Sequence, residues 1–109
     1  MLELSPKQIV ILENIAANGF ATIAFPLYAS AVGIKKGNCA ALLMPIPNGG
    51  LSLLGEPCWL IDDNFTVRIR KTTGEWFVWK KQEVEATAER IAQIVEFRRE
   101  LDSLLVTNL

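Results

Sequence analysis

Apolar residues near the N-terminus recur at the spacing of a helix, and those that share one face are Ile9, Leu12, Ile15 and Ala16. Ser5 and Gln8 stand at the spacing of a capping box, in which each side chain accepts a hydrogen bond from the backbone N–H of the other residue. Pro6 suits the first helical position, and Gly19 can adopt the left-handed conformation that often ends a helix. The pattern predicts a helix over residues 6–18.

The C-terminal part of the chain repeats this spacing, with an apolar stripe formed by Ile91, Ile94, Val95, Leu101 and Leu105. Thr87 stands just before this stripe, where a threonine can accept a hydrogen bond from the first N–H groups of a helix. Glu89 follows in the first turn, where an acidic side chain favours a helix start. We expect a second helix that begins after Thr87.

Short apolar runs separated by turn residues occupy the middle of the chain. Strands are expected at residues 20–25, 39–44, 51–54, 58–62, 65–71 and 75–81. The run 39–44 also fits a short buried helix, and residues 55–57 are expected to end the strand before them. The pattern predicts an α+β fold with an N-terminal helix, an antiparallel β-meander of about five strands and a C-terminal helix. We expect one domain over residues 1–109, with both helices packed on one sheet face.

The first turn between the later strands is predicted at Asp63 and Asn64, which tolerate the left-handed conformations of a tight hairpin turn. This turn would pair Asp62 with Phe65. The strands at 58–62 and 65–71 would then be neighbours in the sheet.

The second turn offers two registers. A two-residue loop at residues 73–74 would pair Lys71 with Trp76, whereas a three-residue loop ending at Gly74 would pair Lys71 with Glu75. We prefer the three-residue loop because it forms a lysine–glutamate pair and gathers apolar side chains on one face. That face, expected to receive both helices, carries Cys58, Leu60, Val67, Ile69, Phe77 and Trp79.

The opposite face combines aromatic, aliphatic and basic side chains, and its members are Trp59, Ile61, Arg68, Arg70, Trp76, Val78 and Lys80. Tryptophan and arginine are enriched at binding hot spots. We expect this predicted interaction face to join two copies of the chain or to bind a protein partner, unless residues 20–45 cover it as a second core layer. The alternative function is binding of an anion or single-stranded nucleic acid, although the sequence pI of about 5.4 weighs against nucleic acid.

The chain of 109 residues contains no histidine, which excludes histidine-based general bases, Ser-His-Asp triads and metal sites with histidine ligands. Cys39 and Cys58 cannot form a four-cysteine zinc site, so we expect neither a metal nor a cofactor and no catalytic residues. A further hypothesis is a Cys39 thiol activated by nearby lysines. Lys35, Lys36 and Asn38 form a candidate anion-binding loop.

Two uncharged stretches, residues 14–34 and 37–55, are long enough to raise the question of a membrane span. Proline and glycine interrupt both stretches, so no span is predicted. The chain lacks a convincing signal peptide and carries only two cysteines, for which we expect reduced thiols and a cytoplasmic location.

Overall fold

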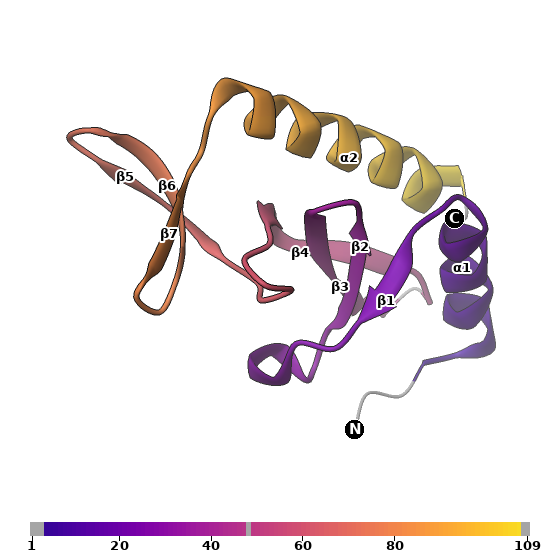
Figure 1. Cartoon of the computed structure of the whole chain (residues 1–109). Helices are drawn as coiled ribbons and strands as arrows, with labels where there is room; N and C mark the ends of the chain where they lie inside the picture. Colours follow the sequence, from indigo (N-terminus) through magenta and orange to yellow (C-terminus); the bar gives the residue numbers. More distant parts are fainter. Residues whose placement is uncertain (1–3, 48, 108–109) are drawn as a thin grey trace.

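In the described part of the chain, two α-helices, one short 3-10 helix and two antiparallel sheets make up the fold (Figure 1). The computed structural model describes residues 4–47 and 49–107. Its elements in chain order are α1 (Pro6–Ala17), β1 (Ala21–Ile23), the short 3-10 helix η1 (Pro26–Tyr28), β2 (Val32–Lys36), β3 (Cys39–Pro45), β4 (Leu51–Trp59), β5 (Val67–Lys71), β6 (Gly74–Trp79), β7 (Gln82–Glu85) and α2 (Ala88–Thr107). The predicted α+β class is confirmed. In the described chain, however, seven strands divide into the sheets β1-β2-β3-β4 and β5-β6-β7 instead of forming one meander of about five.

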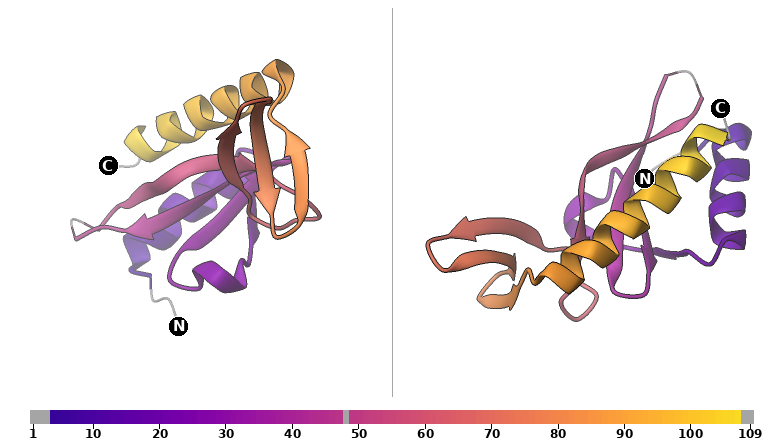
Figure 2. Two further views of the ribbon diagram at one scale, coloured as in Figure 1. Left: turned by 90° about the vertical axis from the view of Figure 1, so that its left-hand side faces the viewer. Right: turned by 90° about the horizontal axis from the view of Figure 1, so that it is seen from above.

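The three-stranded sheet lies beside the N-terminal end of α2, and α2 then runs along the four-stranded sheet toward α1 (Figure 1). Figure 2 shows the β5–β6 hairpin extending away from the rest of the molecule. All five residues of β5 are exposed. Much of the three-stranded sheet is therefore open to solvent.

Both predicted helix starts are confirmed. The Ser5 hydroxyl accepts a hydrogen bond from the Gln8 backbone N–H at 3.2 Å, and the Gln8 side chain accepts one from the Ser5 N–H at 2.8 Å. The Thr87 hydroxyl accepts a bond from the Arg90 N–H at 3.2 Å. No helix in the described part of the chain is both long enough and apolar enough to cross a membrane.

The main core lies between the two helices and one face of the four-stranded sheet. Its buried members are Ile11, Ile15, Phe20, Ile34, Cys39, Ala41, Leu43, Leu51, Phe77, Ile94, Phe97, Leu101 and Leu105. Phe77 is the member that comes from the three-stranded sheet. The helices therefore share a sheet face, as predicted. The prediction that this face carries Val67 and Ile69 is wrong because both side chains are exposed, and the same prediction for Cys58 and Leu60 is wrong because both lie in the second core.

The other face of the four-stranded sheet is covered as well. A second core there contains Phe25, Ala40, Leu42, Cys58, Leu60 and Phe65. The sheet alternates its side chains between the two cores, with Cys39 in the main core and Ala40 in the second. Residues 20–45 thus supply three strands of this sheet, and the segment around η1 helps to cover its second face, instead of the whole stretch covering the predicted interaction face.

The first predicted turn is displaced by one residue. Asp62 and Asp63 take the left-handed conformations, with φ of 49° and 63°, and Ile61 pairs with Asn64. The predicted pairing of the flanking strands is wrong because the chain before this turn ends β4 and pairs with β3.

Strand β4 continues through residues 55–57, where the sequence predicted its end. The continuation depends on an irregularity in the pairing with β3, since Leu54 lies opposite Leu42 and Cys58 opposite Ala40. Three residues of β4 therefore face one of β3. Gly55 absorbs the extra length with a φ of 68°.

Neither predicted register occurs between β5 and β6. A two-residue turn at residues 72–73 places Lys71 opposite Gly74, which takes a φ of 134°. Further along, the pairs are Arg70 with Glu75, Ile69 with Trp76, Arg68 with Phe77 and Val67 with Val78. Because Phe77 enters the main core, its cross-strand neighbour Arg68 shares the inner side of the sheet, and Ile69 lies on the outer side.

Candidate functional site

The register divides the predicted interaction face between the two sides of the three-stranded sheet. Trp76 and Val78 share the outer side with β5 residues, and the outer face is defined here by Val67, Ile69, Lys71, Trp76 and Val78. Arg68 and Arg70 lie on the inner side. The structure therefore separates the two arginines from Trp76.

Both inner-side arginines pair with Glu75. Arg68 Nε lies 2.9 Å from one carboxylate oxygen of Glu75, and Arg70 Nη2 lies 3.3 Å from the other. Glu75 reaches both cations because the register places it directly opposite Arg70. Binding of an anion or single-stranded nucleic acid through the predicted face stays a prediction.

The other members of the predicted interaction face lie elsewhere. Ile61 is buried beside the turn after β4, and Trp59 packs against the main core at the end of β4. The Arg90 guanidinium lies over the Trp59 ring, 5.7 Å from its centre. Lys80 occupies the β6–β7 turn, with its ammonium 5.2 Å from the centre of the Trp79 ring.

The outer face has an exposed aliphatic part and a half-buried tryptophan. Val67 is 55% exposed and Ile69 is 36% exposed. Lys71 crosses the Trp76 ring at 5.7 Å and reaches Glu83, where the ammonium and a carboxylate oxygen are 2.6 Å apart. The indole Nε1 of Trp76 is buried and has no hydrogen-bond partner among the described residues. The outer face is therefore largely apolar, and its central cation, the Lys71 ammonium, is already paired with Glu83.

The candidate anion-binding loop has its polar side chains engaged. Lys35 pairs with Asp63 at 3.0 Å, and Lys36 pairs with Glu100 on α2 at 2.6 Å. The Asn38 amide donates to the Leu60 carbonyl at 2.8 Å. These bonds give the loop a structural role in joining β2 and β3 to neighbouring segments.

Both thiols are buried and free. Burial raises the pKa of the Cys39 thiol to about 11, with a smaller contribution from Cys58. Burial also raises the pKa of Cys58, although a hydrogen bond from the Thr66 N–H at 3.4 Å opposes the effect. A protonated thiol is a poor nucleophile, so these pKa shifts do not favour the hypothesis of an activated Cys39.

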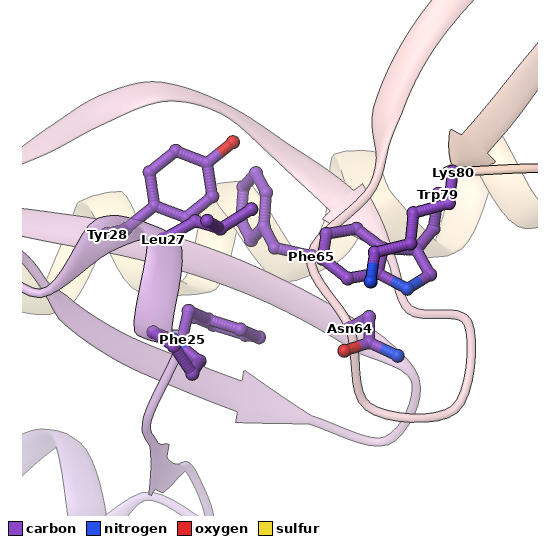
Figure 3. A pocket seen from close by; sticks show the side chains of 8 residues that line it. Phe25, Leu27, Tyr28, Asn64, Phe65, Trp79 and Lys80 are labelled. Atoms are coloured by element: carbon purple, nitrogen blue, oxygen red, sulfur yellow. The ribbon is translucent and has the colours of Figure 1, made fainter.

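An aromatic pocket between the two sheets was not predicted from the sequence. It has a volume of about 260 Å³ and is lined by Phe25, Pro26, Leu27, Tyr28, Asn64, Phe65, Trp79 and Lys80 (Figure 3). Its walls come from η1, from the loop after the first turn and from the end of β6. The available signal was the placement of aromatic residues beside turn residues in all three segments, but their proximity requires the tertiary fold.

The chain has no match in the comparisons with protein-family models, with curated proteins or with solved structures. Its own geometry therefore supplies the basis for a functional proposal.

Proposed function

We propose that the protein is a homodimerisation module that pairs through the outer face of the three-stranded sheet. The observation that carries this proposal is the exposure of Val67 and Ile69 on a sheet side that no other described element covers. Exposed apolar patches on a regular surface commonly mark protein interaction sites. Stacking would bury both aliphatic side chains against their counterparts.

The central cation of the outer face does not oppose a second copy of the chain as the occupant. The central cation, Lys71, is neutralised by Glu83 within its own chain. Two copies of the face can therefore approach without direct repulsion between their central lysines. In a dimer with a twofold axis, both copies contribute the same patch to the interface, which is then isologous.

Two matched valine substitutions test the proposal. Val67→Asp places a carboxylate on the outer face, and Val95→Asp places one on α2, where the native valine is 61% exposed. We expect Val67→Asp to weaken dimerisation by about tenfold or more, because the interface would bury an unpaired charge. Val95→Asp should leave the dimer unchanged. Sedimentation equilibrium measures the monomer–dimer constant of each variant.

A wild-type protein that stays monomeric at millimolar concentration would refute the proposed function. Equal dimerisation constants for the two aspartate variants would place any interface elsewhere. Circular dichroism spectra of the variants check that both retain the fold.

A further inference from the structure

The aromatic pocket has walls that are fixed by contacts within the protein. The Phe65 ring packs edge-on against Phe25, with ring centres 5.3 Å apart at an angle of 75°. The Tyr28 ring meets Phe65 at 5.4 Å and 61°. Such edge-to-face pairs are favourable and hold rings in place. The pocket is therefore preformed and needs little reorganisation to accept a ligand.

Two polar side chains converge on the rim of this pocket (Figure 3). Lys80 lies over the Trp79 ring and has no carboxylate partner among residues 4–47 and 49–107. The Asn64 amide makes one long bond of 3.4 Å to the Asp62 carbonyl. Apolar walls with a few convergent polar groups are typical of small-molecule sites.

The backbone holds Lys80 at the pocket. This residue has a φ of 54° in the turn between β6 and β7, with Trp79 paired to Gln82 across the turn. The next residue, Lys81, has the same charge but does not line the pocket. Lys81 is therefore an internal control for the effect of a positive charge at Lys80.

We propose that the aromatic pocket binds a small aromatic carboxylate. Its ring would lie among the aromatic walls, and its carboxylate would meet the Lys80 ammonium and the Asn64 amide. The volume of about 260 Å³ lies just below the usual range for small-molecule pockets, which limits the ligand to one or two rings. The choice of an anion follows from the unpaired cation at the rim. This site is separate from the outer face and does not depend on dimerisation.

Titration with 2-naphthoate, followed by ¹⁵N nuclear magnetic resonance, tests the proposal on the full chain. We expect saturable shifts of the Trp79 indole N–H and the Asn64 side-chain amide. The neutral 2-naphthamide should bind more weakly. Lys80→Gln should raise the dissociation constant for naphthoate by roughly fivefold, as expected for a partly exposed ion pair. Lys81→Gln should leave it unchanged.

Three results would each overturn the proposal: shifts that do not saturate, equal affinity for the acid and the amide, or equal effects of the two lysine substitutions. Leu27→Ser provides an independent check, because Leu27 lines the pocket yet is 71% exposed. This variant should keep the fold and weaken binding of naphthoate. Unchanged binding would also count against the site.

Discussion

The two cysteines occupy neighbouring strands but separate cores. Cys39 lies opposite Trp59, and Cys58 lies opposite Ala40 in the same pair of strands. Their side chains point to different faces of the sheet, into the main core and the second core. Burial on either face favours the neutral thiol over the thiolate. The pair therefore acts as two small apolar side chains.

The Cys39 thiol gives the stability a pH dependence. The folded thiol titrates near 11 and the unfolded one near 9.0, so the proton is held more tightly in the folded state. Below pH 9.0 the protonated Cys39 thiol contributes fully to the free energy of unfolding. This stabilisation is lost as the pH rises toward 11. We expect a loss of about 2–3 kcal/mol across this interval.

Urea unfolding at a series of pH values measures this effect. In Cys39→Ala the same interval should show a smaller loss of stability, since the other titrating groups are retained. Parallel curves for the wild type and Cys39→Ala would contradict the assignment.

The hydrogen bonds that cap the two helices could be predicted from individual residues. The capping residues Ser5 and Thr87 act as expected because a cap depends only on neighbours within one turn. The hairpin turn was misplaced by one residue, because Asp62, Asp63 and Asn64 all tolerate positive φ. The burial of Ile61 in the tertiary structure determines which two of these residues form the turn.

At the level of elements, strand boundaries depended on pairing that the sequence does not display. Residues 55–57 contain glycine and proline, which usually end strands. Here β4 is an edge strand and Pro57 lies in its bulge, where the register gives it no partner on β3, so the missing N–H of proline interrupts no strand pairing. The bulge opposite Ala41 accommodates the extra length. A local sequence pattern shows neither the edge position of β4 nor its bulge.

The β5–β6 register shows a second limit of prediction. The expected register maximised apolar contacts on one face of an isolated hairpin. Of the hairpin residues that the structure describes, Phe77 alone is a buried member of the main core, and Glu75 pairs with both Arg68 and Arg70. The sequence thus placed Trp76 and Val78 together correctly, but it assigned Val67 and Ile69 to the core face, and it did not separate the two arginines from Trp76.

Gln8 joins α1 to the connection between β3 and β4, in addition to capping the helix. Its side-chain amide donates to the buried Gly50 carbonyl at 3.0 Å. We expect Gln8→Leu to lower the free energy of unfolding by about 1–3 kcal/mol, because both bonds of the side chain are lost. Ser5→Ala removes only the hydroxyl cap and should cost about 1 kcal/mol. Urea unfolding compares the two, and an equal loss would argue against a structural role for the Gly50 bond.

On the scale of the whole molecule, the three-stranded sheet is anchored to the body by Phe77. This side chain is fully buried in the same cluster as Ile94 and Phe97 of α2. Other residues of the hairpin, such as Val67, remain exposed. The anchoring of one sheet to the rest of the protein therefore depends strongly on a single ring.

Phe77→Ala should lower the free energy of unfolding by about 3–5 kcal/mol, the usual cost of removing a buried phenylalanine ring. Val78→Ala, one residue further on the outer side, should cost about 1 kcal/mol. Thermal unfolding followed by hydrogen exchange measures both the global stability and the protection of β5–β7. Comparable losses for the two variants would show that the anchoring is distributed over the hairpin.

Strand order follows chain order in both sheets, so every strand after the first of its sheet pairs with the strand that precedes it. A nascent chain can therefore form its hairpins as soon as each second strand leaves the ribosome. α2 differs because it contacts α1, β3 and β4 and follows all of them in the chain. Until residues 88–107 have been synthesised, the apolar face of the four-stranded sheet has no α2 to cover it. During that interval of translation, chaperones that recognise apolar surface can bind the uncovered face of the four-stranded sheet.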